Sequence, residues 1–179
     1  MNLKKALRYS EIKHGNQMYG EKPYMYHINS VVELAEKLGY SEEIQICCAL
    51  HDVLEDTETT PQDILTNFGV QVFEVVWAAT DADGDNRSTK KQNTYPKIKS
   101  SWKSTVVKIL DRVCNIEACL ELENHEKLIM YEHEHKELFD NVKSKDHSNL
   151  VVPAWKEYGK FYGLSLDPSF KMYINSMSN

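Results

Sequence analysis

Apolar residues along the chain recur at helical intervals. The segment HINSVVELAEKLG has a stripe of them three and four positions apart: Val31, Val32, Leu34, Ala35 and Leu38. Gly39 then stands where helices commonly end, because glycine adopts the left-handed backbone of a C-terminal cap at little cost. This segment is therefore predicted to be an amphipathic helix.

The next segment, SEEIQICCALHDVLED, is more apolar throughout. Ser41 is placed to cap its start, and Glu42 and Glu43 suit the positive end of a helix dipole. The little polar surface that remains predicts a single helix that runs through the centre of the fold.

The same reasoning predicts further helices. Thr60 and Pro61 form a helix start signal, and they open PQDILTNFG, with GVQVFEVVWAATD after it. Residues Asp81 to Lys90 are polar and are predicted to be a loop. The remaining predicted helices are KSTVVKILDRVCNIEACLELEN, about Lys127 to Val142, and Pro153 to Tyr162.

Nothing alternates with a period of two for long enough to predict a sheet, so the fold class is all-α. The length of 179 residues fits one domain over 1–179, with a core from about 6 to 162 and an ambiguous tail over 163–179.

Composition excludes several classes of protein. Hydrophobic residues make up 41% and charged residues 27%, as in soluble globular proteins. The net charge of −6 argues against duplex nucleic acid as a partner. No apolar run reaches the ~20 residues of a membrane span, and the first residues lack the apolar stretch of a secretory signal. We expect a cytoplasmic protein with no membrane partner, and its four cysteines are expected to be reduced core residues.

Charge is nevertheless distributed unevenly. From Asn86 to Leu110 there is no acidic residue, while seven are basic: Arg87, Lys90, Lys91, Lys97, Lys99, Lys103 and Lys108. Such a local field suits a small polyphosphate, and a solvated helix face explains it equally well.

The His51-Asp52 pair is the strongest sign of chemistry. It follows the apolar CCAL, and an unsatisfied buried polar group commonly costs ~1–3 kcal/mol. Both side chains can reach one metal ion over the end of the helix. His27, at the start of the preceding helix, can face His51 if the two helices pack antiparallel.

Two acidic groups extend this pattern. Asp111 lies at mid-helix among apolar residues in VVKILDRVCNI, where a cation would neutralise it. Glu55 and Asp56 lie three and four residues beyond Asp52, on about the same side of the helix end. A carboxylate pair beside a metal can take a proton from the attacking water.

Asn115 shares a helix face with Asp111. It can bond a substrate hydroxyl, orient a ligand or bridge two helices, and the spacing favours none of these. Two imidazoles and two carboxylates suit Mn²⁺, Fe²⁺, Co²⁺ or Zn²⁺.

The ordered set PYMYH, HDVLEDT, FGVQV, TD and VKILDRVCN resembles the hydrolase domain of the RelA/SpoT alarmone enzymes, over roughly Ala6 to Leu122. The length matches the stand-alone small alarmone hydrolases. The resemblance implies a helical HD domain that binds one Mn²⁺ and removes pyrophosphate from the ribose 3′ position of guanosine tetra- or pentaphosphate.

Residue by residue, the resemblance implies His27, His51, Asp52 and Asp111 as metal ligands. It implies Glu55 and Asp56 as the pair that positions and deprotonates water. Substrate contacts are implied for a third group: Asn115 beside the ribose, Thr80 and Asp81 at the start of a mobile loop, and Lys90 and Lys91 as the basic pair on that loop. Arg87, from the same basic segment, is a further candidate substrate contact. Family members carry a basic residue before Gly-x-Pro-Tyr, where this sequence has NQMYGEKPY, and here Tyr19 can stack on a base.

Two other functions stay open at this point. The same residues suit a phosphatase acting on the 2′-phosphate of NADPH or on nucleoside monophosphates. A non-catalytic nucleotide sensor would keep the fold, although it would not need Glu55 and Asp56. The sequence does not indicate an oligomeric state.

Overall fold

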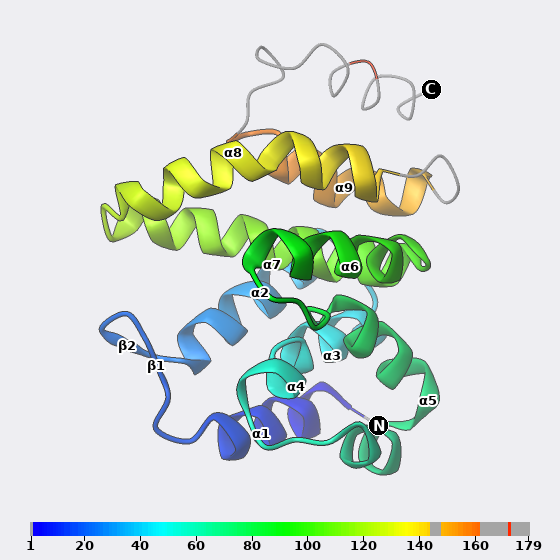
Figure 1. Cartoon of the computed structure of the whole chain (residues 1–179). Coiled ribbons are helices and arrows are strands. Elements are labelled where there is room, and N and C mark those ends of the chain that lie inside the picture. Colours follow the sequence, from blue (N-terminus) through cyan, green and yellow to red (C-terminus); the bar gives the residue numbers. More distant parts are fainter. Residues whose placement is uncertain (1, 144–147, 162–171, 173–179) are drawn as a thin grey trace.

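The structure is a computed structural model, and it describes residues 2–143, 148–161 and 172. Helices dominate this part of the chain (Figure 1), which confirms the predicted all-α class. The elements in chain order are α1 (Leu3–His14), β1 (Met18–Tyr19), β2 (Lys22–Pro23), α2 (Met25–Lys37), α3 (Glu42–Leu50), α4 (Val53–Asp56), α5 (Pro61–Ala79), α6 (Arg87–Lys99), α7 (Trp102–Glu121), α8 (His125–Val142) and α9 (Ser148–Tyr158).

Helix α7 forms the centre of the molecule. It contacts α2, α3, α5, α6, α8 and α9, and in Figure 1 it lies between α8 and α9 on one side and the first five helices on the other. Its fully buried apolar side chains are Val106, Val107, Ile109, Leu110 and Val113. Because so many elements pack on this one helix, the polar residues of α7 are brought close to side chains from both halves of the fold.

Local signals set several helix ends. Thr60 and Asp63 form a capping box at the start of α5, where Pro61 stands in the first turn. Gly39 has a φ of +77° just after α2, as its position predicted. Gly69 has a φ of +83° inside α5 and divides it into the two helical segments that the sequence indicated.

The structure corrects the prediction of one helix from Ser41 to Asp56. The helix ends at Leu50, and the short α4 begins after His51 and Asp52. Asp52 has φ and ψ of −101° and −7°, outside the regular helical range. The expected side-chain cap at Ser41 is also not formed.

The loop predicted from Asp81 to Lys90 is shorter than expected. Helix α6 begins at Arg87, because the Asn86 side chain accepts a hydrogen bond from the Thr89 backbone and caps it. This helix is strongly polar and contains Pro96, so periodicity did not reveal it. Helix α9 begins before Pro153 rather than at it. The hairpin of β1 and β2 is too short to show as an alternating pattern.

The four cysteines are buried and free, which confirms their predicted position in the core. No helix in the described ranges has the length and apolar character that crossing a bilayer requires. The ambiguous tail over 163–179 lies, except for residue 172, outside the described residues.

Candidate active site

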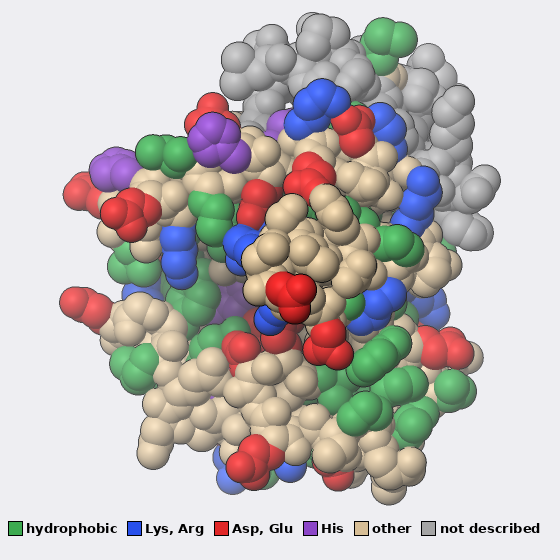
Figure 2. Space-filling model, in the orientation of Figure 1, with side chains coloured by type: hydrophobic (Ala, Val, Ile, Leu, Met, Phe, Trp, Pro, Cys, Tyr) green, Lys and Arg blue, Asp and Glu red, His purple; other side chains and the backbone are tan. Residues whose placement is uncertain are grey.

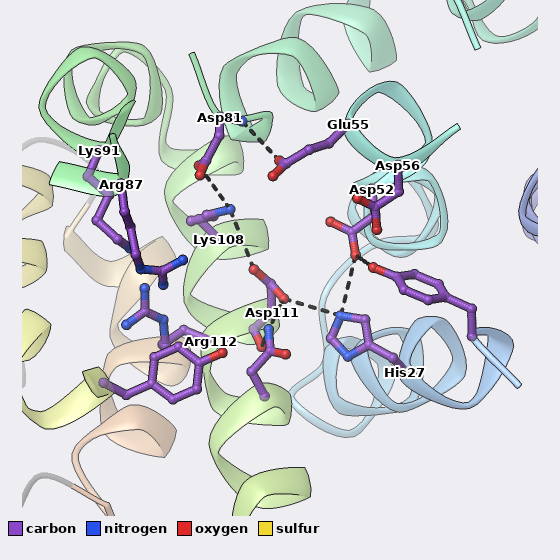
Figure 3. Close-up of a pocket in the computed structure, with 13 residues that line it drawn as sticks. His27, Asp52, Glu55, Asp56, Asp81, Arg87, Lys91, Lys108, Asp111 and Arg112 are labelled. Carbon is purple, nitrogen blue, oxygen red and sulfur yellow. Dashed lines mark hydrogen bonds and ion pairs between the residues drawn. The ribbon is translucent and has the colours of Figure 1, made fainter. Parts of the chain in front are cut away.

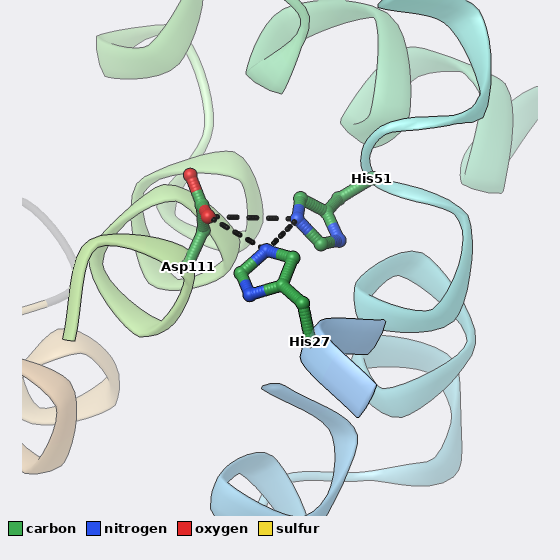
Figure 4. Close-up of side chains that lie close together, drawn as sticks. All are labelled: His27, His51 and Asp111. Carbon is green, nitrogen blue, oxygen red and sulfur yellow. Dashed lines mark hydrogen bonds and ion pairs between the residues drawn. The ribbon is translucent and has the colours of Figure 1, made fainter. Parts of the chain in front are cut away.

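Side chains from three helices meet at one point in the interior. The Nε2 atoms of His27, on α2, and His51, at the end of α3, lie 3.2 Å apart. Asp111 of α7 places Oδ1 3.2 Å from the first and 3.5 Å from the second (Figure 4). These three ligand atoms can surround a single metal ion.

Asp52 lies next to His27 and His51 and belongs to the same group. Its Oδ2 atom lies 2.9 Å from His51 Nε2 and 3.5 Å from His27 Nε2. Successive residues of a regular helix point about 100° apart, so the break between α3 and α4 is what lets adjacent His51 and Asp52 side chains converge.

The hydrogen bonding of His51 fits a ligand. Its Nδ1 lies 2.7 Å from the Cys48 carbonyl oxygen, which only accepts hydrogen bonds, so Nδ1 carries a proton. In the neutral ring this leaves the lone pair of Nε2 directed at the centre of the group. Tyr24 supports Asp52 in a similar way, since its hydroxyl donates to Oδ2 over 2.7 Å.

The electrostatics of the site favour a positive charge at its centre. Burial alone lowers the pKa of His51, but Asp52 and Asp111 outweigh burial and hold that pKa well above its ordinary value. The pKa of Asp111 is raised by burial but lowered further by Lys108 and the two histidines, and it lies well below its usual range. The donor set and its charge therefore fit a divalent cation.

Glu55 and Asp56 lie beside this group on α4. They line a pocket together with His27, Asp52 and Asp111. Glu55 Oε2 accepts a hydrogen bond from the Asp81 backbone over 3.1 Å, and Asp56 Oδ2 accepts one from Gln17 over 3.2 Å. Burial raises the pKa of Glu55, although Lys108 opposes this effect. A carboxylate with a raised pKa is a stronger base near neutral pH.

The opposite wall of the pocket is basic. Arg87 and Lys91 of α6 and Arg112 of α7 line it, and Lys108 lies between this wall and the candidate metal ligands (Figure 3). Lys108 Nζ is 3.6 Å from both Asp81 Oδ1 and Asp111 Oδ2. In the space-filling view a hollow opens on this face, with acidic and basic side chains around it (Figure 2).

Asn115 lines the pocket and bonds to its neighbours on two sides. Its amide nitrogen donates to the Asp111 carboxylate, and its Oδ1 accepts from the Tyr19 hydroxyl over 2.7 Å. The Tyr19 ring stacks on His27, with centroids 4.8 Å apart and an interplanar angle of 8°. In this structure Asn115 thus orients a candidate ligand, and Tyr19 lies against the metal group at the edge of a neighbouring hollow.

Two predicted substrate contacts lie elsewhere. The Thr80 hydroxyl is buried and donates to the Val76 carbonyl in its own helix. The Lys90 side chain is exposed on the surface, one position from Lys91, which faces the pocket. Consecutive helical residues point in different directions, so α6 presents only the second lysine of the pair.

Sequence reasoning did not assign a role to Lys108, Arg112 or Tyr131, all of which line the pocket. The first two could have been found from their spacing, because Lys108 is one helical turn before Asp111 and Arg112 follows it. Tyr131 comes from α8, and no local signal connects it with the site.

A helical bundle with a His-Asp pair at a helix break, and with further candidate metal ligands from two other helices, is typical of HD-domain proteins. Residues 6–145 match the HD domain family model, and the chain belongs to this family. Among characterised relatives, a guanosine-3′,5′-bis(diphosphate) 3′-pyrophosphohydrolase of Aquifex aeolicus is 32% identical over 121 residues, which are 64% of this chain and 17% of the relative. The enzyme of the same name called MESH1 in Drosophila melanogaster is 28% identical over 117 residues, 62% of this chain and 65% of the relative.

The chain thus spans less than two thirds of either relative. Among solved structures, one described as a metazoan ortholog of SpoT that hydrolyzes ppGpp has a TM-score of 0.71 at 24% identity and covers 90% of this chain and 96% of its own. The Listeria monocytogenes protein lmo0812 has a TM-score of 0.52 at 22% identity, covering 89% and 98% respectively. These two likenesses establish the fold.

Proposed function

We propose that the protein is a metal-dependent pyrophosphohydrolase that removes the 3′-diphosphate of guanosine 3′,5′-bis(diphosphate) or a closely related nucleotide. The observation that carries the proposal is the composition of one pocket: it is lined by three of the four candidate metal ligands, His27, Asp52 and Asp111, together with a carboxylate pair and a basic wall. The names of the Aquifex and Drosophila relatives supply the substrate.

His27, His51, Asp52 and Asp111 would hold the cation, for which Mn²⁺ is the proposed identity, since mixed imidazole and carboxylate sites suit it. A bound divalent cation supplies Lewis acidity to the reacting phosphate and to the attacking water. The remaining steps belong to the side chains around it.

Glu55 and Asp56 orient a water molecule and take its proton as its oxygen attacks phosphorus. The bond between phosphorus and the ribose 3′ oxygen breaks, and that oxygen takes up a proton, so the products are guanosine 5′-diphosphate and pyrophosphate. Lys91, Arg87 and Arg112 stabilise the negative charge of the phosphate groups. The proposed contacts of Asn115 with the ribose and of Tyr19 with the base require the bond between these two residues to open.

The test is a nucleotide panel with Mn²⁺, assayed separately for pyrophosphate and orthophosphate. We expect pyrophosphate from guanosine 3′,5′-bis(diphosphate) and none after chelation. Orthophosphate from NADPH or nucleoside monophosphates, without pyrophosphate from the guanosine nucleotide, would instead identify a phosphatase. Tight nucleotide binding without any turnover would identify a sensor.

A further inference from the structure

One carboxylate holds the basic wall together. Glu134 of α8 accepts hydrogen bonds from Arg87 over 2.6 and 3.3 Å, and from Arg112 over 3.0 Å. Lys91 Nζ lies 2.9 Å from the same carboxylate. Three cations from two other helices thus converge on a single anion.

The position of this carboxylate separates it from the surface that a ligand would touch. Arg87, Lys91 and Arg112 line the pocket, whereas Glu134 is not among the lining residues. Its side chain is 12% exposed, and those of Lys91 and Arg112 are 9% and 6% exposed. Arg112 is further fixed by the Tyr131 ring, whose centroid lies 4.4 Å from its guanidinium carbon.

Glu134 leaves the wall basic, because it balances only one of the three positive charges. Without it, like charges would repel one another at short range. Arg87 is 52% exposed and bonds to Glu134 through two nitrogens, so it would be free to turn into solvent. Burial and Arg112 already lower the pKa of Lys91 to about 8, and the loss of an adjacent carboxylate would lower it further. Removal of the Glu134 carboxylate would therefore reduce the positive charge that Arg87 and Lys91 present to the pocket.

We propose that Glu134 is a positioning residue that holds Arg87, Lys91 and Arg112 as a receptor for a phosphate or diphosphate group of the substrate, and so sets substrate affinity more than turnover rate. The inference rests on the proposed function, which it deepens by naming the residue that organises phosphate recognition.

Glu134→Gln keeps the shape of the side chain and removes its charge. With guanosine 3′,5′-bis(diphosphate) and Mn²⁺, we expect KM to rise about 10-fold with kcat nearly unchanged, as for the loss of one charge-assisted contact. Glu132→Gln on the same helix is the control, because Glu132 is exposed and should leave both constants as they are. A lower KM in Glu134→Gln would show that this carboxylate competes with the substrate, and equal effects of the two substitutions would show a general charge effect. Either result overturns the proposal.

A double-mutant cycle tests the positioning role directly. If Glu134 acts through Arg87, Glu134→Gln and Arg87→Gln together should weaken binding by less than the product of their separate effects. Independent, multiplicative effects would contradict this. Should Glu134→Gln fail to fold, Arg87→Gln remains informative, since a half-exposed arginine is replaceable and must still weaken binding.

Calorimetry can measure the binding of inorganic pyrophosphate to the Mn²⁺-loaded protein. This measurement tests the role of Glu134 without depending on turnover. We expect the intact protein to bind pyrophosphate and Glu134→Gln to bind it about 10-fold more weakly. If the protein binds pyrophosphate in this way but hydrolyses no guanosine nucleotide, the proposed function fails and the role of Glu134 stands. No difference between the two proteins would refute the role of Glu134 whatever the substrate is.

Discussion

Tyr24 donates a hydrogen bond from its hydroxyl to Asp52 Oδ2 over 2.7 Å, and this oxygen is the one that faces His27 and His51, the two candidate histidine ligands. The bond fixes which lone pairs of the carboxylate remain for a cation. Partners of this kind commonly contribute a factor of ten or more to metal affinity.

Tyr24→Phe should therefore weaken Mn²⁺ binding about 10-fold without unfolding the protein. Tyr26→Phe is the matched control, because its hydroxyl bonds to the exposed Glu121. Calorimetric titration of both variants with Mn²⁺ measures the difference. Equal affinities would mean that Asp52 needs no such support.

Asp111→Asn should abolish stable metal retention, because it removes the one carboxylate that α7 contributes to the group. An amide is a poorer ligand for a divalent transition metal than a carboxylate is. Elemental analysis after loading and washing would measure the loss, with the exposed His133→Gln as a control. Full metal content in Asp111→Asn would place the ion elsewhere.

Replacement of Glu55 by Gln and of Asp56 by Asn should lower kcat by about 10²-fold or more while nucleotide binding is largely kept. The reason is that both groups are assigned to the proton of the attacking water and not to the nucleotide. Single-turnover rates and equilibrium binding, measured on the same preparation, distinguish the two effects. Unchanged turnover would remove these residues from the mechanism.

The alkaline side of the pH profile should reflect Lys91, whose pKa is lowered to about 8 by burial and Arg112. Below that pH the ammonium is charged and attracts phosphate, and above it the neutral amine does not. We therefore expect kcat/KM to fall as pH rises through about 8, chiefly through KM. Lys91→Arg should remove this fall, because a guanidinium stays charged, whereas the exposed Lys99→Met should keep it.

The capping box at the start of α5 gives a prediction about stability. Thr60 accepts from the Asp63 backbone, and Asp63 accepts in return from the Thr60 backbone. Thr60→Ala should lower the free energy of unfolding in urea by about 1 kcal/mol. The exposed Thr66→Ala, within the same helix, should change it by less than ~0.5 kcal/mol.

The proximity of the four candidate metal ligands could be predicted because each of these residues stands out locally. His51, Asp52 and Asp111 are polar within apolar helices, and an unpaired polar group there would be costly. His27 followed from packing consecutive helices against each other, and α2 and α3 are in contact. A polar residue within an apolar helical pattern can be recognised from a single sequence.

Residues whose importance comes from distant packing could not be predicted in this way. Glu134 lies in EHEHKE, where charged neighbours make it look like an ordinary surface residue. Its partners belong to α6 and α7, and α6 itself was hidden by its polar sequence. The helix break at His51-Asp52 was missed for a related reason. It turns these two side chains toward His27 and Asp111, which belong to other helices.

Asp111 and Arg112 are neighbours on α7, one directed at the histidines and the other at the opposite wall. The Asp111 carboxylate and the Arg112 guanidinium are consequently joined through a single peptide unit of one helix. Because both residues belong to α7, a shift of other helices against α7 would not change the distance between their Cα atoms. In the proposed function, this separation limits how far a substrate's reacting phosphorus can lie from its next anionic group.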